Sequence, residues 1–126
     1  MFAEEIGREL ARVMVVRGPA GAGAPAIEAF VVYWRVRDEV HILNIATDPS
    51  ARRRGHAARL LEHTIAFARR EAGARVLLEV RRSNVAAMRL YRKYGFRPIG
   101  IRANYYAQEH EDAIVMQLTI ERSGRG

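Results

Sequence analysis

The apolar positions of this chain alternate between two spacings, one typical of strands and one typical of helices. Apolar and β-branched residues crowd into runs at 9–17 and 26–37, which flank a tract rich in glycine and alanine. A third run, 40–47, follows directly after Asp38 and Glu39. Short connections between such runs are typical of hairpins, so the first part of the chain predicts an antiparallel meander.

Helical spacing begins after this meander. Between 57 and 72 the apolar residues recur with a period close to 3.6, which predicts an amphipathic helix. A strand at 75–81 follows, and Ser83 or Asn84 is placed to cap a second helix that Gly95 closes. Runs at 96–102 and 113–120 complete the sheet. The resulting order, βββ-α-β-α-ββ, predicts a single α+β domain over 1–126, with a mixed, mostly antiparallel sheet flanked by helices.

Composition excludes several classes of protein. The chain contains no cysteine, which excludes disulfides, thiolate metal sites and a cysteine nucleophile. The four histidines show no metal-binding spacing, so no metal is expected. No apolar run approaches the roughly 18 residues of a membrane span, and the acidic start does not resemble a signal peptide. We therefore expect a cytoplasmic protein.

The charge is strongly positive. The formal net charge is +7, and all but one of the 21 basic residues are arginine, the exception being Lys93. Such a balance predicts attraction to anions. A nucleic-acid module would need basic residues interleaved with exposed aromatics. Here Phe67, Tyr91 and Tyr94 fall at helical spacing with apolar residues, so we expect no direct binding of nucleic acid.

A basic loop lies between the third strand and the first helix. Arg52, Arg53, Arg54 and Gly55 come immediately before the helical run. The first N–H groups of a helix lack intrahelical partners, and the helix dipole adds positive charge there. A glycine also lets an anion approach the backbone closely. The segment indicates a pyrophosphate site, and the alternative is a solvated basic helix start.

Polar residues at apolar positions mark further candidates. Glu79 interrupts an apolar strand, where a carboxylate is costly to bury unless it is paired or used. It could face solvent at an edge or pair with Arg75 or Arg81. Tyr91 lies on the inner face of the second helix, where a core aromatic is the simpler interpretation. Asn84 fits a helix cap and could also touch a ligand. The segment 104–106 (N-Y-Y) is expected to be a loop with exposed aromatics, which could serve the turn itself or form part of a substrate wall.

Several motifs in order carry a resemblance to a known family. Arg52-x-x-Gly55-x-Ala57 after a strand matches the R/Q-x-x-G-x-G/A signature of the GNAT N-acetyltransferases. The segments 44–63, 78–96, 101–106 and 111–116 resemble the RimI-type branch, whose members acetylate the N-terminal alanine of a ribosomal protein. The resemblance covers roughly residues 40–118. It implies the GNAT fold and transfer of an acetyl group from acetyl-CoA to a primary amine, without a metal.

The resemblance also implies a role for each matching residue. Glu79 corresponds to the general base and Tyr91 to the general acid. The strand end around Ile45 should pair with the pantetheine arm, the basic loop should wrap the pyrophosphate, and Asn84 should contact the cofactor near the thioester. The implied cofactor-binding residues are Ile45, Ala46, Thr47, Arg52, Arg53, Arg54, Gly55, His56, Ala57, Ala58 and Asn84.

The chain departs from the family pattern in two places. His56 stands where an apolar residue is common, and it could lie over the phosphates. The usual first strand and two helices, which help to build the acceptor groove, are not found ahead of residue 9. The domain is therefore expected to be short at its N-terminus, with a truncated start, completion by another subunit in a homodimer, or a different acceptor as explanations.

Three functions follow from the resemblance. The first is acetylation of a protein N-terminus, such as that of a ribosomal protein. The second is acetylation of a small amine or a lysine side chain. The third is a non-catalytic module that binds acetyl-CoA.

Overall fold

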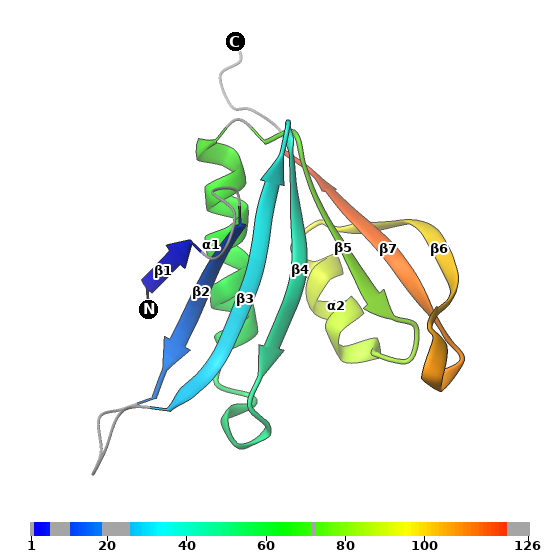
Figure 1. Cartoon of the computed structure of the whole chain (residues 1–126), viewed down its shortest axis with the longest axis horizontal. Coiled ribbons are helices and arrows are strands. Elements are labelled where there is room, and N and C mark those ends of the chain that lie inside the picture. Colours follow the sequence, from blue (N-terminus) through cyan, green and yellow to red (C-terminus); the bar gives the residue numbers. More distant parts are fainter. Residues whose placement is uncertain (1, 6–10, 19–25, 72, 121–126) are drawn as a thin grey trace.

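One seven-stranded sheet and two α-helices make up the part of the chain that the structure describes (Figure 1). The computed structural model describes residues 2–5, 11–18, 26–71 and 73–120. The strands are β1 (Phe2–Glu5), β2 (Ala11–Arg17), β3 (Ile27–Val36), β4 (Glu39–Thr47), β5 (Arg75–Arg81), β6 (Arg97–Tyr106) and β7 (Glu111–Thr119). The helices are α1 (His56–Arg70) and α2 (Val85–Lys93), with short 3-10 turns η1 (Pro49–Ala51) and η2 (Ala107–Glu109).

The predicted order of elements is confirmed from β2 onward, and β2, β3 and β4 form the expected antiparallel meander. The tract between β2 and β3 lies outside the described residues at 19–25, as do Glu9 and Leu10. The sequence interpretation missed β1, a short strand that pairs with β2 and carries two acidic residues. The prediction of a loop at 104–106 is wrong, because β6 continues to Tyr106. The predicted exposure of an aromatic residue there is confirmed for Tyr105.

The sheet divides between β4 and β5. These strands pair in parallel over only three positions, from Glu39 opposite Arg75 to His41 opposite Leu77. Beyond this point they diverge, and Figure 1 shows them meeting at one end and separating toward the other. β5 then pairs with β7 along its full length, and β6 forms the outer edge. One edge of β4 therefore faces a gap instead of a neighbouring strand.

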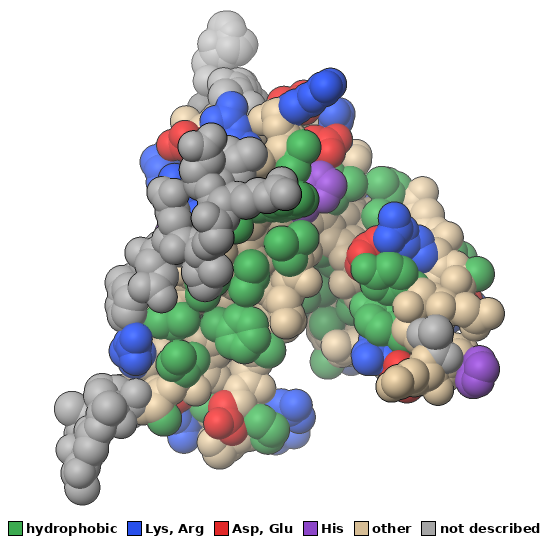
Figure 2. All heavy atoms as spheres, in the orientation of Figure 1, with side chains coloured by type: hydrophobic (Ala, Val, Ile, Leu, Met, Phe, Trp, Pro, Cys, Tyr) green, Lys and Arg blue, Asp and Glu red, His purple; other side chains and the backbone are tan. Residues whose placement is uncertain are grey.

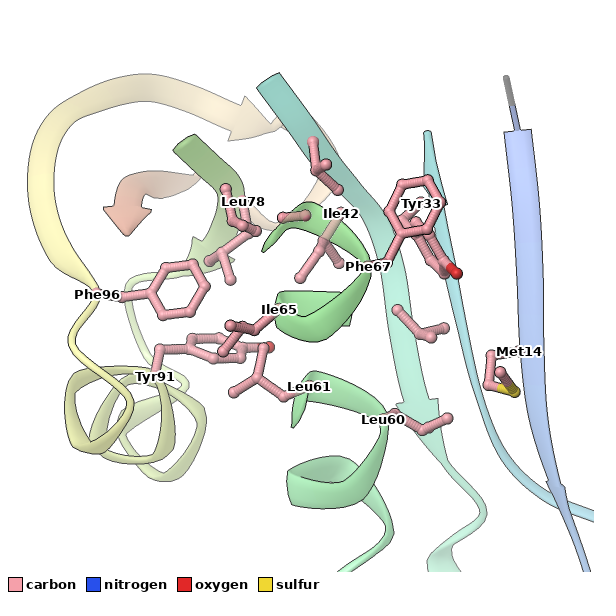
Figure 3. Packing of buried hydrophobic residues seen from close by; sticks show 14 of the residues in the cluster. Met14, Tyr33, Ile42, Leu60, Leu61, Ile65, Phe67, Leu78, Tyr91 and Phe96 are labelled. Carbon is pink, nitrogen blue, oxygen red and sulfur yellow. The ribbon is translucent and has the colours of Figure 1, made fainter. Parts of the chain in front are cut away.

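The apolar core fills the space between α1 and the sheet and extends to α2. Leu60 and Leu61 on α1 are fully buried, as the helical period predicted, and Phe67 and Tyr33 meet edge to face with ring centroids 5.1 Å apart. Phe96, which follows α2, is also fully buried, and Figure 3 shows it beside the Tyr91 ring. Burial of these side chains fixes both helices against the divided sheet.

Candidate active site

A cavity of about 740 Å³ occupies the gap between β4 and β5. Figure 2 shows the molecule hollowed between its two halves in the region that these strands border. The cavity is lined by residues of β4, β5, the start and inner face of α2, and the β6–β7 hairpin. Glu79, Tyr91, Asn84 and Ile45 are among the lining residues. Four of the residues singled out from the sequence thus meet in one hollow, although they come from three different elements.

Glu79 has a partner that differs from those considered from the sequence. Its carboxylate lies 3.0 Å from the guanidinium of Arg102 on β6, while Arg75 pairs with Asp38 and Glu39, and Arg81 pairs with Glu109 and Glu111. The Glu79 side chain is 28% exposed and Arg102 is 57% exposed. The acid therefore stands at the wall of the cavity with one face toward its interior, neither in the core nor fully in solvent.

Tyr91 is held deep in the same cavity wall. Its side chain comes from α2 and is 6% exposed, and its ring lies 5.8 Å from that of Phe96. Burial, with a smaller contribution from Tyr106, raises the pKa of Tyr91 to about 12. Nothing among the described residues hydrogen-bonds its hydroxyl. The phenol consequently keeps its proton at neutral pH and can donate it to a group in the cavity.

Two aromatic residues of β6 form the outer wall of the cavity. Tyr105 and Tyr106 meet edge to face with ring centroids 5.1 Å apart. The guanidinium of Arg81 lies 4.0 Å from the centre of the Tyr106 ring, and that of Arg102 lies 5.2 Å from the Tyr105 ring. Cation–π contacts of this kind stabilise the wall and surround Glu79 with polar groups.

Asn84 caps α2 and also lies at the cavity. Its side-chain oxygen accepts a hydrogen bond from the backbone N–H of Ala87 at 3.1 Å, which confirms that it caps α2. It also lines the cavity. Capping consumes only the oxygen, so the amide nitrogen remains available to a ligand.

The basic loop lies beyond the end of β4 that is remote from its pairing with β5. Arg52, Arg53 and Arg54 are exposed, and α1 begins at His56, one residue earlier than predicted. Backbone φ is positive at Arg53 and Gly55, and the space over the Cα of Gly55 is open for at least 4 Å. The first N–H groups of α1 are therefore presented beside a bare backbone with three arginines around it, as an anion site requires.

The His56 ring does not lie over this loop. It is 7% exposed, and its Nε2 is 2.7 Å from a carboxylate oxygen of Glu28 on β3. Its backbone N–H, rather than its ring, is the part available to a ligand. Ala46 and Thr47 lie on β4 between the loop and the cavity but do not line the cavity itself.

Sequence reasoning missed Arg102 and Glu28. Arg102 reaches Glu79 across β7, because Glu79 pairs with Val115 of that strand and Arg102 pairs with Ala113. This strand order has no local signal in the sequence. Glu28 lies 28 residues from His56. The departure from the family pattern at His56 gave no indication that Glu28 would be its partner.

Comparison with known proteins agrees with the fold. The model of the acetyltransferase (GNAT) family matches residues 20–96, which is more than half of the chain. The chain belongs to the GNAT acetyltransferase family. Its match to this family includes the basic loop, β5 with Glu79, and α2 with Tyr91.

Similar proteins are named as N-acetyltransferases. A ribosomal protein bS18-alanine N-acetyltransferase of Salmonella typhimurium is 48% identical over 94 residues, which is 73% of this chain and 64% of that protein. An N-alpha-acetyltransferase RimI of Mycobacterium tuberculosis is 43% identical over 63% of this chain and 47% of that protein. The chain thus spans less than two thirds of the length of these relatives.

Solved structures show the same arrangement. The ribosomal-protein-S18-alanine N-acetyltransferase of Escherichia coli superposes with a TM-score of 0.72 at 42% identity, over 79% of this chain and 66% of that one. The NatC complex bound to Gag peptide and CoA gives a TM-score of 0.73 at 25% identity, over 90% of this chain and 72% of that one.

Two absences hold for the described residues. None of their helices has the length and apolar character needed to cross a membrane. Within the same residues, histidine and acidic side chains do not gather into a group that could hold a metal ion.

Proposed function

We propose that this protein transfers the acetyl group of acetyl-CoA to the N-terminal α-amine of a protein, with Glu79 as general base and Tyr91 as general acid. The observation that carries the proposal is that Glu79 and Tyr91 line one cavity, at the point where β4 loses its neighbour. Relatives named as N-acetyltransferases of ribosomal protein alanine support the same acceptor class for this chain.

The free edge of β4 explains how the donor would lie. Past His41, the edge of β4 opposite β3 has no strand partner among the described residues, and it leads from the cavity toward the basic loop. A pantetheine arm carries amide groups that can hydrogen-bond such an edge as an added strand would. The pyrophosphate would then reach the N-terminus of α1, and the thioester would reach the cavity beside Asn84.

The two candidate residues supply complementary proton transfers. A free α-amine has a pKa of about 7.7–8.0, so a useful fraction is neutral near pH 7.5. The amine nitrogen attacks the thioester carbon, and Glu79 takes the proton that the nitrogen loses, directly or through a water. As the carbon–sulfur bond breaks, Tyr91 gives its proton to the CoA thiolate. No covalent enzyme intermediate is needed, in agreement with a chain that contains no cysteine.

The test measures release of CoA thiol from acetyl-CoA with peptides that differ in their first residue and with small amines. We expect turnover with peptides that begin with Ala or Ser, and a loss of about 10²- to 10⁴-fold in kcat in Glu79→Gln and in Tyr91→Phe. Glu109→Gln and Tyr94→Phe are matched controls, since each removes the same group from outside the cavity lining.

Different outcomes separate the three functions. Turnover with small amines and none with peptides would contradict the N-terminal assignment. Binding of CoA with no turnover on any acceptor would support a non-catalytic module. Full activity in Glu79→Gln would show that another group accepts the proton.

A further inference from the structure

A single carboxylate joins the two sides of the basic loop. Glu28, near the start of β3, accepts a hydrogen bond from His56 Nε2 at 2.7 Å through one oxygen. Its other oxygen accepts one from Arg54 Nη1 at 3.1 Å. These two partners stand on either side of Gly55, so Glu28 spans the turn at which α1 begins.

The same residue also holds the beginning of this segment. The backbone carbonyl of Glu28 accepts a hydrogen bond of 2.7 Å from the N–H of Asp48, which caps η1. Glu28 thus fastens the segment from Asp48 to His56 at both ends. Its side chain is 16% exposed and that of His56 is 8% exposed, whereas Arg54 is 54% exposed. The contacts with His56 are therefore built into the fold, and the guanidinium of Arg54 remains open to solvent.

The turn needs such support because its backbone is not relaxed. Arg53 has a φ of 67°, which is uncommon for a residue with a side chain. A segment of mobile arginines would also lose conformational freedom when it closes on a phosphate. A carboxylate that holds the turn before the ligand arrives removes part of this cost.

We propose that Glu28 is a positioning residue that holds the Arg52–His56 turn in the conformation that receives the pyrophosphate of acetyl-CoA. This role rests on the proposed function, because it assumes acetyl-CoA as the donor. Glu28 acts through His56 and Arg54 and has no part in acetyl transfer. Its loss therefore weakens binding of the nucleotide end of the donor and spares the chemistry.

Gly18 offers a second way to disturb the same contact. A Cβ atom added at Gly18 would lie 2.5 Å from Glu28 Oε2, which is closer than side chains approach one another. The atom that must move is the end of a flexible side chain. Gly18→Ala therefore displaces the carboxylate from Arg54 while leaving Glu28, α1 and the loop sequence intact.

The experiment compares two donors that share the thioester and the pantetheine arm. Acetyl-CoA carries the pyrophosphate, and S-acetylpantetheine does not. In Glu28→Ala, we expect kcat/KM with acetyl-CoA to fall about tenfold through KM, the scale of a lost charge-assisted contact, while kcat/KM with S-acetylpantetheine stays within about twofold. Gly18→Ala should likewise lower the ratio of kcat/KM for acetyl-CoA to kcat/KM for S-acetylpantetheine. Glu28→Gln keeps an acceptor oxygen and should lower this ratio less.

Glu39 provides a matched control. It also accepts from a histidine and an arginine, His41 Nε2 at 2.9 Å and Arg75 Nε at 3.1 Å, but at the opposite end of β4. Glu39→Ala should change kcat/KM for the two donors by the same factor. A general loss of stability would also change kcat/KM for both donors by the same factor. Such a loss can therefore be distinguished from a defect in pyrophosphate binding, which affects acetyl-CoA alone.

Two results would overturn the role of Glu28. One is an unchanged or lower KM for acetyl-CoA in Gly18→Ala and Glu28→Ala, and the other is an equal loss with both donors. If Glu28→Ala does not fold, Gly18→Ala carries the test. A wild-type protein that neither binds nor uses acetyl-CoA would refute the proposed function itself, which is a different observation.

Discussion

The carboxylate of Glu79 lies 3.0 Å from the guanidinium of Arg102, although β7 separates their strands in the sheet. The pair spans the wall of the cavity between β4 and β5. It allows two interpretations of Glu79. The acid could serve the fold through its ion pair, or it could serve chemistry in the cavity while Arg102 balances its charge.

Stability separates these interpretations. Arg102 is 57% exposed, and a pair so open to solvent contributes about 0–1 kcal/mol to stability. We therefore expect Arg102→Gln and Glu79→Gln each to lower the free energy of unfolding by less than about 1 kcal/mol in urea titrations. A loss of several kcal/mol of unfolding free energy in Glu79→Gln would favour the structural interpretation. The loss of turnover in this variant would then result from unfolding and not from the absence of a general base.

Asn84 gives a prediction in which capping and ligand contact come apart. Its side chain caps α2, and loss of an N-cap costs about 1 kcal/mol. Asn84→Ala should therefore lose about 1 kcal/mol of stability, and Asn84→Ser should retain it because serine also caps helices. The serine variant lacks the amide group of this cavity-lining residue. A higher KM for acetyl-CoA at unchanged stability in Asn84→Ser would confirm a ligand contact, and an unchanged KM would leave Asn84 as a cap alone.

Most of the fold was predictable because it follows from local patterns. The strand at 75–81 and the cap at Asn84 agree with the structure, and α1 was predicted to begin within one residue of its observed start. Periodicity and capping act over a few residues, so a sequence records them directly. β1 escaped notice because its four residues, Phe2–Glu5, are too few to show a period.

The candidate site was predictable only in part. Glu79, Tyr91 and Asn84 stand out by position, and the structure brings them to one cavity. The partners of these residues depend on the order of strands and on contacts between distant segments. The sequence around Glu79 does not indicate Arg102 as a partner, and the sequence around His56 does not indicate Glu28. Such pairings arise from topology, which local patterns do not encode.

His63 should make the protein less stable in acid. Its Nε2 lies 2.9 Å from the Tyr33 hydroxyl, and burial, followed by Arg70 and Arg12, lowers the pKa of His63 below its ordinary value. Burial also raises the pKa of Tyr33, so this hydrogen bond joins two groups that are both neutral at pH 7.5. A histidine with a lowered pKa contributes stability above its unfolded pKa of about 6.5, and this stability is lost as the pH falls. Unfolding measured from pH 7.5 to pH 5 should show a smaller decline in His63→Gln than in wild type. Parallel declines would exclude His63 as a source of acid sensitivity.

Tyr91 should make the protein sensitive to alkali. Burial, with a smaller effect of Tyr106, raises its pKa to about 12 from an ordinary value of 10.0. Since the folded state holds this proton more tightly than the unfolded chain, the contribution to stability is complete below pH 10 and is lost as the pH rises toward 12. A shift of this size corresponds to roughly 2–3 kcal/mol.

The comparison with Tyr91→Phe isolates this contribution, because phenylalanine keeps the ring against Phe96 and has no proton to lose. Between pH 9 and pH 12, wild type should lose roughly 2–3 kcal/mol more unfolding free energy than the variant, and other alkaline effects should cancel in the difference. Equal losses would mean that the hydroxyl has ready access to water in the cavity. Tyr91 would then be less suited to retain its proton until a thiolate forms beside it.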